Sequence, residues 1–311
     1  MRLASNTFAV VVNWNGGELN LCCLRSLVLQ GLTHEQLVFV DNGSRDGAAA
    51  QVRAAFPAAR IVVNEANQGF AKASNQGLEL ALQAGAREVL FANNDVEFPA
   101  GTLALLLRSL ASDPSLGIVG PRVAYARAPE LLWCAGGTLN FHQNLTRLLA
   151  HKEPDAESWR RTARVDFVPG CAMLVRREVF ERIGGFDPDF FAYHEDVDFC
   201  TRALEHGFGV ACVGEALAFH EPHSSTGGGY NPRRKYMMGV NSVWFLRRHG
   251  TPWRWTSFLM FDVLTWPALL AAAPFRGHTR AVLAKGKGIF DGLRGLRVTP
   301  ETVERDSGHL W

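Results

Sequence analysis

The residue pattern of this chain predicts an α/β fold with a mostly parallel central sheet flanked by helices. Four short apolar runs in the first half have the length and β-branched composition of buried strands: residues 8–13, 37–40, 60–63 and 88–92. Two segments between these runs, 19–30 and 77–84, have apolar residues at helical spacing. Strands that alternate with helices pair in parallel and place helices on both faces of the sheet.

Polar residues follow these strand-like runs closely. Asn13, Asp41 and Asp95 each end or follow an apolar run, and Asn67 comes soon after the third run. The carboxyl ends of parallel strands meet at one edge of the sheet, where α/β proteins bind ligands. We therefore expect these four side chains to converge on a binding site. The residues alone leave Asp41 two roles, a carboxylate that binds a nucleotide or the cap of a turn.

The overall composition is that of a folded protein with one large domain or two unequal ones. The chain has 311 residues, of which 47% are hydrophobic and 20% are charged. A net charge of +2 gives no indication of nucleic-acid binding. The six cysteines show no CxxC spacing, which favours a reduced, cytosolic setting over disulfides or a zinc site. Residues 1–7 lack the features of a signal peptide.

An acid-rich segment, residues 186–202, turns abruptly into an amphipathic helical pattern. Glu195 and Asp196 lie at the predicted helix start, where the helix dipole favours ionised carboxylates. Asp198 and Arg202 are four residues apart and are expected to pair on the outer face. Asp196 is then the acid with the least evident structural role. On this segment alone, an acid-decorated helix start and a catalytic carboxylate are equally good interpretations.

Two residues after strand-like runs have the chemistry of metal ligands. Asp95 follows Asn93 and Asn94, and its carboxylate suits Mg²⁺ or Mn²⁺ bound to a diphosphate. His220 ends the later apolar run at 209–220, and Mn²⁺ also accepts imidazole. The alternatives are an ordinary turn at Asp95 and a structural histidine at 220. His223 is a weaker substitute for His220.

Other aromatic and basic residues suggest where further parts of a substrate bind. Trp133 is either an aromatic platform for a sugar or a core residue. The glycine-rich stretch at 224–230 precedes Arg233 and Arg234, and it is either a loop that closes over a diphosphate or an ordinary linker.

The last 80 or so residues differ in character from the rest. A helix is predicted at 233–248, followed by a strongly apolar segment, 253–275, that contains Asp262 and two prolines. Basic residues dominate 276–297. Because a charged residue and prolines are unfavourable in a membrane span, the pattern favours a helix lying at the membrane surface. A true span and simple packing against the main domain are the alternatives.

Five motifs in register resemble the family 2 glycosyltransferases, specifically the bacterial branch similar to rhamnosyltransferases. The resemblance covers roughly residues 8–223, and the motifs are Val10-Val11-Val12-Asn13-Trp14-Asn15-Gly16, Val38-Phe39-Val40-Asp41-Asn42-Gly43-Ser44, Asn67-Gln68-Gly69-Phe70, Phe91-Ala92-Asn93-Asn94-Asp95 and the block at 184–202. It implies a GT-A fold, with a Rossmann-like nucleotide-binding half and a C-terminal helical extension. The domains expected are 1–230, with halves meeting near residue 120, and a membrane-associating region at 231–311.

The resemblance also implies a role for each matching residue. Asp196 is the expected general base, and Asp95 and His220 are the expected ligands of Mg²⁺ or Mn²⁺. Apart from the resemblance, Trp133, for its aromatic face, and Glu195 are the residues expected to bind the acceptor. The residues expected to bind the nucleotide sugar are Asn13, Asn15, Asp41, Asn67, Gly69, Asn75 and Asn94. Asn93 and Asn94 replace acids found in many relatives, which implies weaker binding of the metal.

The activity implied is an inverting transfer of a sugar, L-rhamnose or a hexose, from a nucleotide-diphosphate sugar to a hydroxyl of a glycan or lipid-linked acceptor. It would take place in the cytoplasm, at the inner face of the plasma membrane, in the synthesis of a surface or cell-wall polysaccharide. One alternative is a sugar-1-phosphate nucleotidyltransferase, but the loop at 13–17 lacks the Arg and Lys that such an enzyme needs. The other is a non-catalytic nucleotide-sugar-binding partner subunit.

Overall fold

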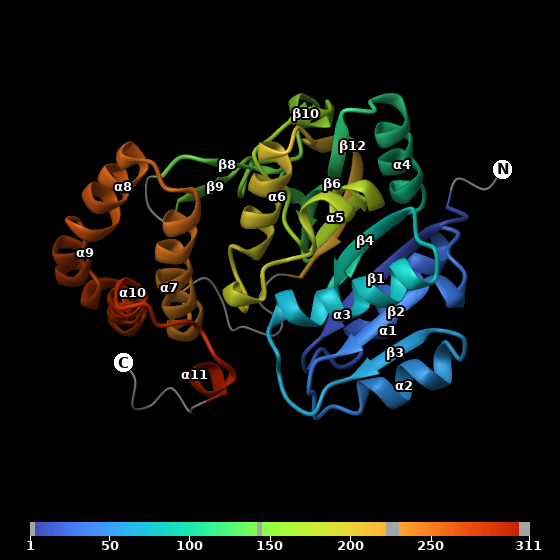
Figure 1. Cartoon of the computed structure of the whole chain (residues 1–311), viewed down its shortest axis with the longest axis horizontal. Helices are drawn as coiled ribbons and strands as arrows, with labels where there is room; N and C mark the ends of the chain where they lie inside the picture. The colour runs from blue at the N-terminus through green and yellow to red at the C-terminus, as the bar shows by residue number, and fades with distance from the viewer. Residues whose placement is uncertain (1–3, 142–144, 222–229, 305–311) are drawn as a thin grey trace.

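A computed structural model describes residues 4–141, 145–221 and 230–304. The expected glycine-rich loop at 224–229 and His223 lie outside the described residues. One large sheet forms the centre of the molecule, with the strand order β10-β12-β6-β11-β4-β1-β2-β3 (Figure 1). Two further strands, β5 and β7, pair with β12 and β6, and β8 and β9 form a small separate sheet.

Most strands of the central path run in one direction. The pairs β1–β2, β1–β4, β2–β3 and β6–β12 are parallel, whereas β11 is antiparallel to both β4 and β6. The strands are β1 Thr7–Asn13, β2 Leu37–Asp41, β3 Arg60–Val63, β4 Glu88–Asn93, β5 Val96–Glu97, β6 Leu116–Tyr125, β7 Ala128–Cys134, β8 Gly137–Leu139, β9 Thr146–Leu148, β10 Ala163–Arg164, β11 Ala172–Arg176 and β12 Gly209–His220. The predicted mostly parallel sheet is therefore confirmed.

Helices cover both faces of the sheet because the strands alternate their side chains between two cores. Along β1, Val10 and Val12 belong to one core and Ala9 and Val11 to the other. The first core includes residues of α3 Phe70–Gln83, α5 Arg177–Ile183 and α6 Glu195–Glu205, and the second includes residues of α1 Leu19–Leu29, α2 Ala48–Ala55 and α4 Thr102–Ser112. Each face is thus buried under helices, as a parallel sheet requires.

The observed bounds differ from the predicted ones mainly at the irregular parts. The helix predicted at 77–84 begins earlier, at Phe70, because Gly69 with φ of 86° provides its start. The strand expected across 165–175 is confined to Ala172–Arg176, after the interruption at Pro169 and Gly170. The first four predicted strands and the strand at 209–220 match to within one residue at each end.

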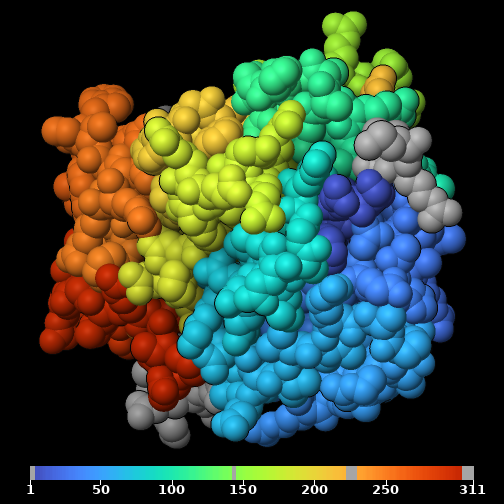
Figure 2. All heavy atoms as spheres, turned by 45° about the vertical axis from the view of Figure 1, so that its right-hand side comes forward, coloured from blue at the N-terminus to red at the C-terminus, as the bar shows by residue number. Residues whose placement is uncertain are grey.

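The C-terminal part is helical, as predicted, and lies at one end of the molecule, in orange and red (Figure 2). It comprises α7 Pro232–His249, α8 Pro252–Phe258, the π-helical turn η4 Leu259–Val263, α9 Trp266–Ala272, the 3₁₀ turn η5 Pro274–Arg276, α10 Thr279–Leu293 and α11 Pro300–Glu304. Gly239 lets α7 and α10 approach closely, since a Cβ there would lie 2.5 Å from the Lys285 carbonyl oxygen. This close packing joins the two helices into one unit.

Candidate functional site

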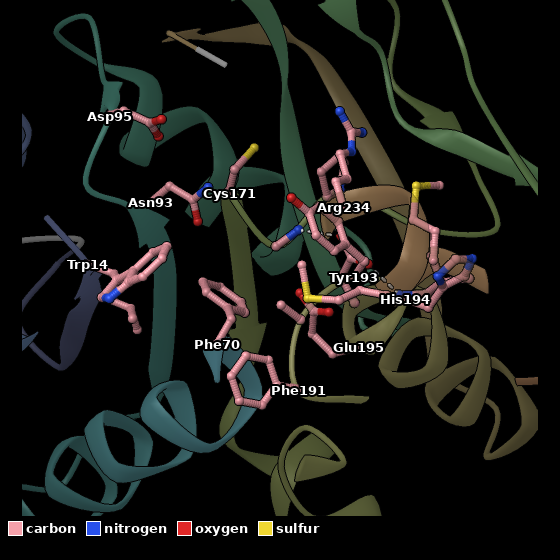
Figure 3. A pocket seen from close by; sticks show the side chains of 18 of the residues that line it. Trp14, Phe70, Asn93, Asp95, Cys171, Phe191, Tyr193, His194, Glu195 and Arg234 are labelled. Carbon is pink, nitrogen blue, oxygen red and sulfur yellow. Dashed lines mark hydrogen bonds between the residues drawn. The ribbon is translucent and has the colours of Figure 1, made fainter. Parts of the chain in front are cut away.

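A cavity of about 520 Å³ opens at the carboxyl edge of the sheet. It brings together seven of the expected catalytic, metal-binding and substrate-binding residues, Asn67, Asn94, Asp95, Trp133, Glu195, Asp196 and His220, and also Arg233 and Arg234. In Figure 3, Asp95, Asn93 and Trp14 lie on one side of it, and Tyr193, His194 and Arg234 lie on the other. The cavity therefore has a wall built from strand ends and an opposite wall built from the segment before α6 and from α7.

Three of the expected nucleotide-binding residues stabilise the turns at the strand ends instead of lining the cavity. Asn13 is fully buried, accepts a hydrogen bond from Asn94 Nδ2 (2.8 Å) and donates one to Ser44 Oγ (3.0 Å). The Asp41 carboxylate accepts from the Ser44 backbone N–H (3.1 Å), the turn-capping role that the sequence left open. Asn15 Oδ1 accepts from a backbone N–H in the same turn, that of residue 45 (2.9 Å).

Gly69 and Asn75 hold the segment before α6, and neither lines the cavity. A Cβ on Gly69 would lie 2.7 Å from the carbonyl oxygen of Phe191, so this glycine permits a close approach of two backbones. The Asn75 side chain donates to the Phe186 carbonyl (2.7 Å) and accepts from the Phe186 N–H (2.9 Å). It thus makes the two backbone hydrogen bonds that a neighbouring β-strand would make. Asn67 lines the cavity while its Oδ1 accepts from the Gly69 N–H (2.9 Å).

Asp95 and His220 meet at one corner of the cavity, both buried. Asp95 Oδ1 lies 3.2 Å from His220 Nε2, and the Trp133 ring packs edge-on against the imidazole at a centroid distance of 4.7 Å. The strands β5 and β12 bring Asp95 and His220 together, because Val96, the residue after Asp95, pairs with His220 in the sheet. The expected acceptor residue Trp133 therefore also orients His220.

This corner fits one side of a divalent cation site. Two ligands at neighbouring positions of an octahedral Mg²⁺ site lie about 3 Å apart, close to the observed oxygen–nitrogen distance. Within the described ranges, no group of three or more His, Cys, Asp or Glu is placed to hold a metal ion. A cation at Asp95 and His220 therefore needs most of its ligands from a bound substrate and water.

Asp196 lies in the first turn of α6, with both carboxylate oxygens engaged by backbone donors. Its Oδ2 accepts from the Gly170 N–H (2.9 Å) and its Oδ1 from the Val197 N–H (2.8 Å). These bonds fix the carboxylate at the cavity and leave each oxygen a further lone pair for a substrate. Burial raises the pKa of Asp196, although the Gly170 and Val197 bonds favour the ionised form.

Glu195 is buried beside Asp196 and has a different environment. Its Oε2 has no hydrogen-bond partner within the part of the chain that the structure describes. Burial, and then the neighbouring Asp196 carboxylate, raise the pKa of Glu195 well above its usual range. The two adjacent acids therefore favour different protonation states. Glu195 is the one more readily protonated, and Asp196 is the one more readily ionised.

The segment before α6 has an unusual backbone. Phe191, Tyr193 and His194 all have positive φ angles, of 55°, 70° and 69°. Such conformations are costly in residues other than glycine, so the surrounding structure must stabilise them. Segments held in this way are frequent at functional sites, and this one lines the cavity.

One side chain from the C-terminal region stabilises this backbone. Asn241 of α7 is fully buried, and its Nδ2 lies within hydrogen-bond distance of the carbonyl oxygens of Phe190 (2.7 Å), Ala192 (2.8 Å) and Tyr193 (2.8 Å). The intervening Phe191 carbonyl accepts from the Ala71 N–H (3.2 Å). Asn241 was not predicted as a functional residue, although a lone amide in a mostly apolar helical stretch signals a buried polar contact.

Asp198 and Arg202 form the predicted pair, at 2.8 Å, but the expected outer-face position is wrong. The Asp198 side chain is fully buried, and His249 Nε2 from the end of α7 lies 2.9 Å from its other oxygen. Burial alone would raise the pKa of Asp198, but the His249 hydrogen bond and the Arg202 charge outweigh it and lower the pKa. The pair faces inward because α7 covers this side of α6.

Comparison with known proteins places the chain among sugar-transferring enzymes. The sequence model of a family described as "Glycosyltransferase like family 2" matches residues 5–238. N-acetylglucosaminyl-diphospho-decaprenol L-rhamnosyltransferase of Mycobacterium tuberculosis is 29% identical over 237 residues, covering 70% of this chain and 76% of the relative. The dTDP-rhamnosyl transferase RfbF of Shigella flexneri is 24% identical over 255 residues, covering 80% and 82%.

Solved structures resemble the fold. A mannosyltransferase from Pyrobaculum calidifontis, in complex with GDP-Man and Mn²⁺, has a TM-score of 0.56 at 19% identity, covering 93% of this chain and 87% of that one. GalNAc-T7 with UDP, GalNAc and Mn²⁺ has a TM-score of 0.54 at 12% identity, covering 85% and 57%. The fold is therefore of the GT-A type, as the sequence predicted.

Replacing Asn241 with leucine tests its role in positioning the segment before α6. The variant keeps the branched shape of the side chain but removes the donor to three carbonyls, so we expect turnover to fall about 100-fold, the order expected for a misplacement of about 1 Å. The donor KM should change little, and hydrogen exchange of the amides at 190–194 should accelerate. Ser242→Ala is the control, because the Ser242 hydroxyl bonds only within its helix. Unchanged turnover in a folded Asn241→Leu protein would refute the role.

Glu195→Gln tests the cost of burying the two acids. The folded-state pKa of Glu195 is raised, so the folded protein binds more protons than the unfolded chain above about pH 4.3, and stability falls as pH rises through the raised value. Glutamine does not titrate. We expect the melting temperature of the variant to exceed that of the wild type at neutral pH, with the difference shrinking near pH 4. The exposed Glu79→Gln should show no such trend.

Proposed function

The chain belongs to glycosyltransferase family 2, in its rhamnosyltransferase-like branch, and we propose that it transfers the sugar with inversion, using Asp196 as the general base. It is a glycosyltransferase that takes its sugar from a nucleotide sugar. The observation that carries the proposal is the placement of the Asp196 carboxylate, fixed at the cavity by the Gly170 and Val197 N–H groups with a raised pKa. A carboxylate of raised basicity in a fixed position is what a general base requires.

In the proposed mechanism, Asp196 accepts the proton of an acceptor hydroxyl while that oxygen attacks the anomeric carbon from the face opposite the diphosphate. A single displacement of this kind inverts the centre and needs one catalytic carboxylate. Glu195, whose pKa is raised further, is suited to donate a hydrogen bond from its protonated carboxyl to the acceptor. Gly170 and the first turn of α6 stabilise the Asp196 carboxylate before the proton arrives.

We propose that Asp95 and His220 hold a divalent cation, Mg²⁺ or Mn²⁺, together with the donor diphosphate. Their buried carboxylate and imidazole, 3.2 Å apart, support this set of ligands. When bound, the cation neutralises charge that develops on the departing diphosphate. The nearby Asn94 amide is neutral where an acid would add a charge, which favours a weakly held ion that enters with the donor.

The acceptor is proposed to occupy the side of the cavity near Trp133 and Glu195. The name of the Mycobacterium tuberculosis relative specifies a lipid-linked saccharide acceptor and transfer of L-rhamnose. We propose the same classes here: a nucleotide-diphosphate rhamnose or hexose as donor, and a glycan or lipid-linked saccharide as acceptor. Cytosolic location, peripheral at the inner face of the plasma membrane, follows from such an acceptor.

The domain organisation proposed is a GT-A domain at 1–230, with donor and acceptor halves meeting near residue 120, and a C-terminal helical region at 231–311. Asn241 supports a close functional dependence between the two, because it stabilises the segment that leads to Asp196. The family match favours a glycosyltransferase over the nucleotidyltransferase and partner-subunit alternatives.

Asp196→Asn tests the general base. We expect transfer to fall by at least about 100-fold, the lower end of what general base catalysis contributes, because asparagine keeps the shape but does not accept the proton. Binding of the nucleoside diphosphate, measured by calorimetry, should be nearly unchanged. A donor screen that monitors release of nucleoside diphosphate supplies the activity assay. Full turnover in the variant would remove Asp196 from this role.

Asp95→Ala tests the cation site. We expect the affinity for nucleoside diphosphate in the presence of Mn²⁺ to fall at least about tenfold. Loss of a residue that only supports a metal ligand already lowers metal affinity about tenfold or more, and loss of the ligand itself should cost at least as much. Affinity for the nucleoside alone, without metal, is the control and should stay constant. Equal diphosphate affinity of the two proteins with metal present would count against Asp95 as a ligand.

A further inference from the structure

Most of the large apolar side chains that stay exposed in the described ranges lie in the C-terminal helical region. Trp253 is 77% exposed and Phe275 is 92% exposed. The others in this segment are Leu259, Met260, Phe261, Leu264, Leu269, Leu283, Phe290, Leu293 and Leu296. We call this set the apolar face. It lies on α8, η4, α9, η5, α10 and the residues just after α10, at the end of the molecule opposite β3 and α2 (Figure 1).

The exposed charges within residues 250–300 have one sign. Residues 250–300 contain seven basic residues and two acids, Asp262 and Asp291. Both acids are buried, and they pair with Lys285 and Lys287. Arg276, Arg280 and Arg294, in contrast, are exposed, and no ion pair joins them to another described residue. The outward surface of residues 250–300 is therefore apolar and positively charged.

The segment is long enough to cross a membrane, but its inner face is attached to the protein. Pro252–Ala272 has 21 residues, the length of a span. Ser257 Oγ donates to the Phe141 carbonyl (3.0 Å), and Trp266 Nε1 donates to the Val282 carbonyl (3.0 Å). Insertion across a bilayer would break these bonds and separate Asp262 from Lys285, at the cost of burying charge in lipid.

From these observations we propose that the apolar face docks onto an anionic lipid bilayer, with α8, η4 and α9 lying in the plane of the interface and not across it. An apolar surface that carries the exposed cations Arg276, Arg280 and Arg294 is complementary to the negative cytoplasmic leaflet. The π-helical turn η4 turns Asp262 inward and leaves Leu259, Met260 and Phe261 outward. This arrangement accounts for a charged residue in the middle of an apolar segment.

Docking in this way places the cavity close to the membrane, a consequence that rests on the proposed function. The first turns of α7 line the cavity with Arg233, Arg234 and Met237, while α7 packs against α10 through Gly239. The helix α7 thus separates the cavity from the docked helices α8, α9 and α10. Packed helices lie about 8–10 Å apart. An acceptor held in the bilayer by a lipid is then within reach of the cavity.

The test is co-sedimentation of the full-length chain with vesicles. We expect binding to phosphatidylcholine vesicles that contain phosphatidylglycerol and much weaker binding to phosphatidylcholine alone. The triple variant Arg276→Gln, Arg280→Gln, Arg294→Gln should bind the anionic vesicles about 100-fold more weakly. Each cation near an anionic surface contributes about 1 kcal/mol, and the variant removes three. Trp253→Ser with Phe275→Ser should also weaken binding. Equal binding to both vesicle types, or no effect of either variant, would overturn the proposal.

Matched controls separate the docking surface from general effects. Leu29→Ser changes an exposed leucine far from the apolar face, and Arg53→Gln with Arg108→Gln removes exposed cations elsewhere; neither should alter vesicle binding. High salt should weaken binding to the anionic vesicles because it screens the exposed cations, and binding that salt leaves unchanged would contradict their role. Self-association through the apolar face, seen by sedimentation equilibrium without vesicles, would assign the surface to a second copy instead. Vesicle binding requires no catalysis, so its outcome is independent of whether Asp196 is the base.

Discussion

The burial of two adjacent carboxyl groups, Glu195 and Asp196, is the constraint on which the rest of the site depends. Burial disfavours their charged forms, and each raises the cost of ionising the other. The fold offsets this cost with backbone donors, since Gly170 and the first turn of α6 direct N–H groups at Asp196. The Asp196 carboxylate is therefore held at a fixed position where it can accept a proton, and this arrangement lowers the stability of the folded protein.

The strained segment before α6 follows from the same constraint. For both acids to enter the cavity at the start of a helix, the chain must turn sharply, which it does with positive φ at Phe191, Tyr193 and His194. Asn241 and the Ala71 N–H occupy the carbonyl groups that this turn leaves without regular partners. The C-terminal helix α7 therefore belongs to the machinery of the site, even though the family match ends at residue 238.

The sequence predicted the parts of the molecule that depend on local pattern. The first four strands and the strand at 209–220 are apolar runs, mostly buried on both sides, so their bounds were predictable to within about one residue, whereas the strand expected across 165–175 is confined to Ala172–Arg176. Asp95, Asp196 and His220 were placed at one cavity because strand ends and helix starts converge there. The direction of a polar side chain was not predictable. Asn13 and Asn75 bind the protein's own backbone and side chains, through partners up to 111 residues away. Asn241 was missed for the same reason.

The link between α6 and α7 also connects the site to the proposed membrane surface. His249, at the end of α7, bonds to Asp198 in α6, and Asn241 holds the segment before it, so two contacts fix α7 against the helix of the proposed base. The opposite side of α7 packs on α10, whose outer side belongs to the apolar face. In the proposed docking, the bilayer, the helices α8, α9 and α10, then α7 and finally α6 form successive layers that end at Asp196. A lipid-linked acceptor presented at the first layer would meet a base whose position relative to the bilayer is set by rigid helix packing.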